Sequence, residues 1–111
     1  MNIELTPENL LIQLGYPVKE ATLAQMERIV ANTPGFEKFA KHLLTLNDEV
    51  KRFGGIVGLS NSKDYLKVKT DATEPAEVEA FTEYVTQWAE KYKVALEKVE
   101  GKNTYYILGH Q

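Results

Sequence analysis

An apolar residue recurs at every third or fourth position between Phe36 and Gly54, which is the spacing of one face of an α-helix. The residues of this stripe are Phe36, Phe39, Leu43, Leu46, Val50 and Phe53. Thr33 and Pro34 suit the beginning of such a helix, and the pair Gly54-Gly55 suits its end. Because a long amphipathic helix needs a cover for its apolar face, we expect the other elements to pack against this one.

Two shorter helices are predicted before this central helix. The first spans about Thr6–Leu14, where a capping residue and a proline precede a run of leucines. The second ends near Ala31 and begins either at Val18 or at Thr22, because Thr22 has capping-box spacing with Gln25. Both are short enough to be marginal alone, so each must dock on the rest of the chain.

After Gly55 the periodicity changes from helical to alternating, which is typical of β-strands. Ile56–Ser60 and Tyr65–Lys69 are predicted strands, and the polar residues 61–64 between them predict a hairpin loop. This loop length pairs the apolar residues of one sheet face, Leu59 with Leu66 and Val57 with Val68.

A fourth helix, at about Pro75–Lys93, is followed by a second hairpin. Its apolar stripe repeats the spacing of the central helix and consists of Val78, Phe81, Val85, Trp88 and Tyr92. The opposite face of the helix carries glutamates and should be solvated and negative. The second hairpin pairs Val94–Val99 with Thr104–Leu108 around Gly101, and this register places Leu96 opposite Ile107.

The predicted fold class is α+β, with the element order ααα-ββ-α-ββ. Its two hairpins form a four-stranded antiparallel sheet with the helices packed on one face. The whole chain, 1–111, is expected to be a single domain in which a short helical hairpin, 1–32, docks on a core formed by 33–111. The strand order stays open, because either strand of the first hairpin can lie beside the second hairpin.

Composition excludes several classes of protein. The chain has no cysteine, so disulfides, thiolate metal sites and a cysteine nucleophile are excluded. The first residues do not resemble a secretory signal, and no apolar run has the length of a membrane helix, so we expect a cytoplasmic protein without a membrane partner. A net charge of −3 argues against a protein that binds nucleic acid chiefly through its overall charge.

Residues that often carry chemistry form no recognisable set in this sequence. His42 lies at the edge of the central apolar stripe without a second histidine nearby, and His110 lies in the tail, where mobility is expected. Gly54, Gly55 and Gly58 match no phosphate-binding loop, because they follow a helix and precede a strand. The sequence therefore predicts no catalytic residue, no metal site and no cofactor, which favours a protein without catalytic activity but leaves an enzyme open.

The outer face of the sheet is the candidate binding surface. Depending on the register, its tyrosines and lysines are Tyr65, Lys67, Lys69, Lys98, Tyr105 and Tyr106. We expect first a non-catalytic interaction module that binds a protein partner or a second copy through this face or the acidic fourth helix. The alternative is that the face binds single-stranded nucleic acid or a small anionic ligand, which the net charge disfavours. A third interpretation is an enzyme whose site assembles from distant residues or across a dimer.

Overall fold

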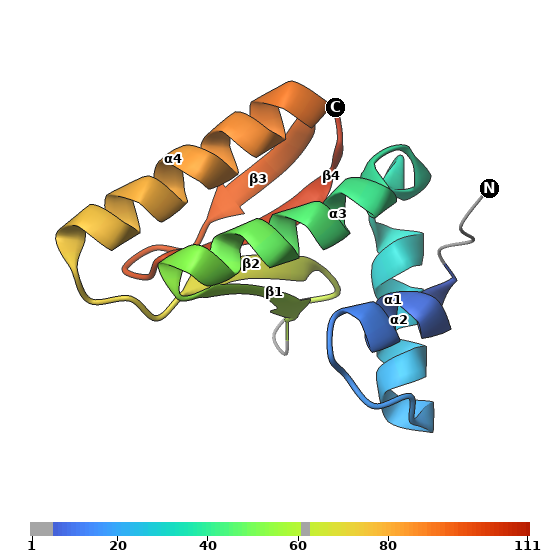
Figure 1. Ribbon diagram of the computed structural model, residues 1–111. Helices are drawn as coiled ribbons and strands as arrows, with labels where there is room; N and C mark the ends of the chain where they lie inside the picture. Colours follow the sequence, from blue (N-terminus) through green and yellow to red (C-terminus); the bar gives the residue numbers. More distant parts are fainter. Residues whose placement is uncertain (1–5, 61–62) are drawn as a thin grey trace.

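The computed structural model describes residues 6–60 and 63–111, and it confirms the predicted α+β fold and the order ααα-ββ-α-ββ (Figure 1). The helices and strands, in chain order, are α1 (Pro7–Gln13), α2 (Glu20–Asn32), α3 (Phe36–Val50), β1 (Gly55–Leu59), β2 (Leu66–Thr70), α4 (Pro75–Tyr92), β3 (Val94–Lys98) and β4 (Thr104–His110). A short 3-10 turn, η1 (Lys51–Phe53), extends α3 toward β1. No helix among the described residues is long and apolar enough to span a membrane.

The sheet is antiparallel throughout and has the order β1-β2-β4-β3, so β2 is the strand that meets the second hairpin. The predicted registers are confirmed: the partners on the inner face are Leu59 and Leu66, Val57 and Val68, and Leu96 and Ile107. A register shift near Ala95 and Leu96 bends the β3–β4 ladder close to the end of β4.

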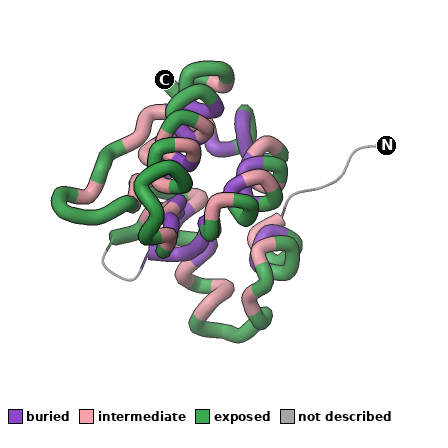
Figure 2. Tube along the Cα trace, turned by 60° about the vertical axis from the view of Figure 1, so that its left-hand side comes forward, coloured by how far each residue is buried: buried purple, intermediate pink, exposed green. Residues whose placement is uncertain are grey.

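Helices α3 and α4 cover one face of the sheet, and the buried positions gather between these helices and the strands (Figures 1 and 2). Both apolar stripes reach the core, including Phe39 and Leu43 from α3 and Phe81 and Trp88 from α4. Leu96 is only half-buried, because it belongs to β3 at the edge of the sheet. No helix formed by residues 6–60 or 63–111 covers the outer face of the sheet.

Side chains from other elements form hydrogen bonds with backbone groups along the outer edge of β1. The backbone N–H of Val57 donates to Oδ1 of Asn47 at 3.0 Å, and that of Leu59 donates to the hydroxyl of Tyr16 at 3.1 Å. The side-chain amide of Gln25 donates to the carbonyl of Ser60 at 2.7 Å. Helix α2 and the loop between α1 and α2 therefore dock on β1, and an exposed strand edge becomes an internal contact.

Replacing Asn47 with alanine should lower the free energy of unfolding by about 1–3 kcal/mol, because the buried N–H of Val57 would then have no acceptor. Urea denaturation measures the change. Asn32→Ala is the control, since its amide donates to Asp64 at an exposed site and should cost little. Equal effects of the two substitutions would show that Asn47 does not support the edge of β1.

Several predicted boundaries are wrong by a few residues. Thr33 does not cap α3: its hydroxyl donates to the carbonyl of Ile29 at 2.7 Å and so closes α2, while Gly35, with φ 64°, occupies the cap position. β4 runs past the predicted end to His110, whose N–H donates to the carbonyl of Pro34 at 2.8 Å. His110 is thus part of the sheet and not of a mobile tail. The predicted first hairpin loop falls partly outside the described residues, since these exclude 61–62.

Candidate functional site

Strand alternation places a row of polar side chains on the outer face of the sheet. Lys67 of β2 lies opposite Tyr106 of β4, and Lys69 lies opposite Thr104. The neighbours of these residues along both strands, such as Val68 and Ile107, point into the core. Directly opposed residues of an antiparallel pair share one face, so the outer row repeats a lysine beside a hydroxyl-bearing side chain.

The structure brings four of the six predicted residues onto this face. Tyr65 lies beside Tyr106, with 6.2 Å between the ring centroids, and Lys67 and Lys69 follow along β2. The prediction that Lys98 joins them is wrong, since Lys98 pairs with Tyr105 on the side of the sheet that the helices cover.

Tyr105 belongs to the helix-covered side as well. It lies opposite the buried Val68, and its ring is 6.5 Å from that of Phe81 in α4. Tyr106 is therefore the tyrosine of β4 that faces outward. Whether any of the six residues binds a ligand stays a prediction.

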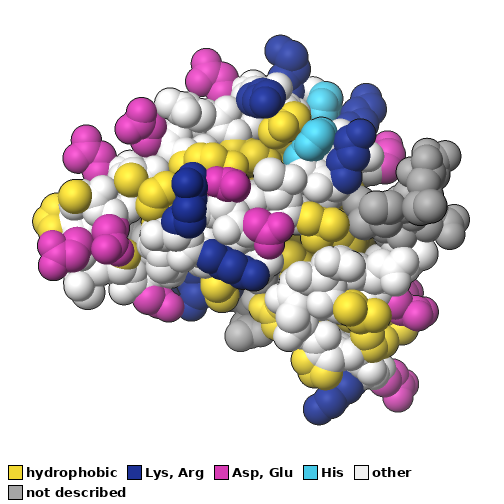
Figure 3. Space-filling view, viewed as in Figure 1, with side chains coloured by type: hydrophobic (Ala, Val, Ile, Leu, Met, Phe, Trp, Pro, Cys, Tyr) yellow, Lys and Arg dark blue, Asp and Glu magenta, His cyan; other side chains and the backbone are white. Residues whose placement is uncertain are grey.

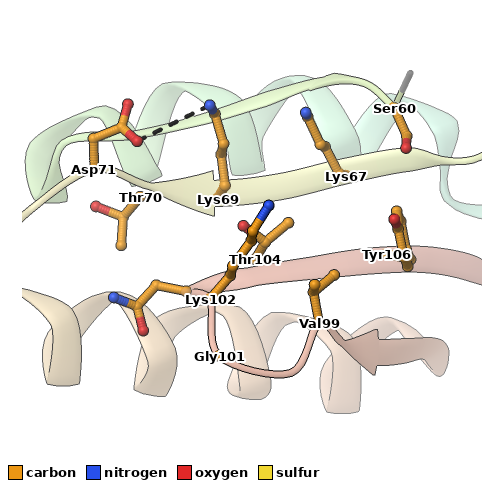
Figure 4. Close-up of a pocket in the computed structure, with 11 residues that line it drawn as sticks. Ser60, Lys67, Lys69, Thr70, Asp71, Val99, Gly101, Lys102, Thr104 and Tyr106 are labelled. Carbon is orange, nitrogen blue, oxygen red and sulfur yellow. Dashed lines mark ion pairs between the residues drawn. The ribbon is translucent and has the colours of Figure 1, made fainter. Parts of the chain in front are cut away.

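An open groove of about 610 Å³ runs over this face (Figure 4). Its lining combines lysine side chains with hydroxyl and amide groups, and consists of Ser60, Lys67, Lys69, Thr70, Asp71, Val99, Gly101, Lys102, Asn103, Thr104 and Tyr106. In Figure 4 the side chains of Lys67, Lys69 and Lys102 extend to the same side of the strands. The groove thus gathers cations from β2 and from the β3–β4 turn.

Lys102 reaches the groove because the β3–β4 turn folds back toward the end of β2. Gly101 has a φ of 77°, and the N–H of Lys102 donates to the carbonyl of Val99 at 3.2 Å. The carbonyl of Asn103 accepts a hydrogen bond from the N–H of Thr70 at 3.1 Å, which ties the turn to β2. Sequence reasoning missed Lys102, because a turn residue has no strand periodicity that assigns it to a face.

Carboxylates neutralise the lysines of the groove only in part. Asp71 Oδ1 lies 4.0 Å from Nζ of Lys69, at the limit of an ion pair. Among the described residues, neither Lys67 nor Lys102 forms an ion pair. Nζ of Lys63 lies 5.2 Å from the ring centroid of Tyr106 and 4.0 Å from Oε2 of Glu97, so this lysine adds little net charge. The local charge of this face is therefore positive although the chain is negative overall.

His42 lies on the helix side of the molecule, away from the groove. Its ring stacks on Tyr92 with 3.8 Å between centroids, and its carbonyl accepts a hydrogen bond from Nε1 of Trp88 at 3.1 Å. Burial lowers the pKa of His42, and the charges of Lys41 and Lys91 lower it further. The stacking on Tyr92 and the hydrogen bond from Trp88 are the contacts of a packed residue. No group of three potential metal ligands occurs among the described residues.

Removing the stacked ring by Tyr92→Ala should raise the pKa of His42 toward its ordinary value, which an NMR titration of the imidazole measures. Since the folded state holds this pKa low, the contribution of neutral His42 to stability is present above the ordinary histidine value. It is lost as the pH falls through the lowered pKa. His42→Gln should remove this dependence and leave ligand binding at the groove intact. An unchanged titration in Tyr92→Ala would contradict the assigned cause.

The chain matches no protein-family model, no curated protein and no solved structure.

Proposed function

We propose that the outer-face groove is a binding site for an anionic, phosphate-bearing ligand. The observation that carries this proposal is the convergence of Lys67, Lys69 and Lys102 on one open groove, two of them without an ion pair among the described residues. Lysine ammonium groups bind phosphate as point charges, and the hydroxyl of Thr104 adds a hydrogen-bonding group beside them. An anion in the groove would offset the mutual repulsion of the three cations.

The negative net charge does not oppose this function, because the fold separates the charges. Glu77, Glu79, Glu83 and Glu90 are exposed positions of α4, and Figure 3 shows acidic side chains along that side of the molecule. The lysines of the groove lie on the opposite side of the sheet. An anion that approaches the sheet face therefore meets local positive potential, since solvent screens charges more than about 10 Å away.

The double substitution Lys67→Gln with Lys102→Gln tests the proposal. It should weaken the binding of inorganic tripolyphosphate by at least about tenfold, because each lysine contributes a charge-assisted contact. NMR chemical shifts of the full chain report both the affinity and the residues that respond.

The matched control is Lys91→Gln with Lys98→Gln, which removes the same charge from α4 and from the helix-covered side of β3. This control should bind tripolyphosphate as the parent does, apart from a small effect of net charge. A site at this face would be contradicted if both pairs of substitutions weakened tripolyphosphate binding equally. It would also be contradicted if tripolyphosphate changed the chemical shifts of residues outside the groove in the parent.

Binding of a protein partner at the same face is the second candidate function. The observation that favours it is the Tyr65–Tyr106 pair, since tyrosine is enriched at protein interfaces. Such a complex should depend on salt less steeply than an anion complex does. A cytoplasmic location and the absence of catalysis stay predictions from the sequence.

A further inference from the structure

We infer that the ligand of the outer-face groove is single-stranded nucleic acid, with bases stacked on Tyr106 and Tyr65 and phosphates held by Lys67, Lys69 and Lys102. This inference rests on the proposed function, because it names the chemical class of the anion. It follows from three features of the face: a pair of tyrosines, a repeat of lysines along β2, and the open groove beside them.

The tyrosine pair supplies a stacking surface next to the cations. The rings of Tyr65 and Tyr106 lie 6.2 Å apart at an angle of 42°, and Tyr106 is the direct cross-strand neighbour of Lys67. Lys63 holds its ammonium 5.2 Å from the centre of the Tyr106 ring and 4.0 Å from Glu97. One face of that ring is thus directed at groups on the surface and not at the core. A base can take the place of Lys63 on the ring, which frees this lysine to contact phosphate.

The lysine spacing fits a chain of repeating charges. Lys67 and Lys69 are two residues apart on one strand, which separates their Cα atoms by about 7 Å along the outer face. Lys102 lies across the groove from the end of this row. A single compact anion would engage one end of the groove, whereas a strand of nucleotides places successive phosphates along it.

The composition of the groove predicts binding with little sequence preference. No arginine occurs among the described residues that line it. The two parallel hydrogen bonds by which a guanidinium group recognises guanine therefore cannot form from these residues. Stacking on tyrosine accepts every base, because each has a π-face. Duplex nucleic acid should bind less well, since its bases stay stacked on one another and cannot reach the two rings.

The test compares a short fluorescent oligothymidylate with an abasic oligonucleotide of the same length and charge, by anisotropy at low and physiological salt. The parent should bind the oligothymidylate at least tenfold more tightly than the abasic strand. Tyr106→Ala should weaken binding of the oligothymidylate by roughly 5- to 150-fold, the range for losing one stacked base, and leave the abasic strand unaffected. Tyr106→Phe, which keeps the ring, should bind as the parent does. Should Tyr106→Ala fail to fold, Tyr65→Ala takes its place.

The outcomes separate this inference from the proposed function. Equal affinity for the two strands, with tripolyphosphate still bound, would leave the anion site standing and overturn the nucleic-acid inference. If the protein binds neither the oligothymidylate, nor the abasic strand, nor tripolyphosphate, both proposals are overturned. A polyglutamate peptide is the third probe. If it binds as tightly as the oligothymidylate, and if Tyr106→Ala abolishes that binding, the inference is overturned in favour of an acidic protein partner.

Discussion

Replacing Trp88 with alanine should lower the free energy of unfolding by about 3–5 kcal/mol, a large share of the stability of a domain of this size. Trp88 is 4% exposed and lies between α4 and α3, where its ring meets that of Phe39 edge-on at a centroid distance of 6.4 Å. Its Nε1 also donates to the carbonyl of His42 at 3.1 Å. The substitution therefore removes the largest side chain of the helix–helix contact and one buried donor together.

Urea denaturation followed by circular dichroism measures the loss. Trp88→Phe keeps an aromatic ring in the core and removes the donor with only part of the volume, so it should cost clearly less than Trp88→Ala. Gln87→Ala, on the exposed side of the same helix, should change the free energy of unfolding by less than about 0.5 kcal/mol. A Trp88→Ala protein as stable as the parent would remove Trp88 from the core.

Apolar periodicity was sufficient to predict the layers of this fold. The spacing of Phe39, Leu43 and Leu46 has only one interpretation as a buried helix face, and these residues are fully buried. The same spacing on the fourth helix predicted that Trp88 is buried, as the structure has it. Alternation on the strands likewise fixed the pairing of Leu59 with Leu66, because a shift by one residue would turn the apolar set toward solvent.

Details set by single contacts between distant segments were not predictable. Thr33 is a good capping residue, yet its hydroxyl completes the preceding helix, and the cap position of α3 is a glycine with positive φ. β4 continues to His110, which pairs with Val94 of β3 and whose N–H also donates to the carbonyl of Pro34, far away in sequence. No local pattern around His110 contains that information.

The error at Lys98 has a different origin, because the sequence already contained the correct answer. Residues two apart on a strand share a face, so the predicted pairing of Leu96 with Ile107 places Lys98 on the covered side and Tyr106 on the outer side. Net charge carries no information about where the charges lie: exposed glutamates follow α4, whereas the lysines of the groove lie on the other side of the sheet. Strand alternation was therefore enough to predict most of the candidate face, whereas Lys102 in the β3–β4 turn was not predictable from it.

Replacing Gly109 with alanine should destabilise the protein by at least about 2 kcal/mol. Gly109 has a φ of 147°, where a side chain adds about 1–3 kcal/mol of backbone strain. A Cβ there would also lie 2.8 Å from Cδ and 3.0 Å from the carbonyl oxygen of Pro34. The carbonyl that would be pushed away accepts the N–H of His110, so the substitution should also loosen the end of β4.

Gly101→Ala is the matched control for this prediction. Gly101 also has a positive φ, of 77°, but a Cβ there would meet no atom within 4 Å. This control should show the strain of a left-handed backbone alone, about 1–2 kcal/mol, so a larger loss in Gly109→Ala reports its more extreme φ together with the contact with Pro34. Hydrogen exchange at His110 gives an independent measurement: it should speed up in Gly109→Ala and not in Gly101→Ala, because only the first disturbs the acceptor of that N–H. Equal destabilisation by both substitutions, with His110 equally protected, would mean that Pro34 does not hold the end of β4.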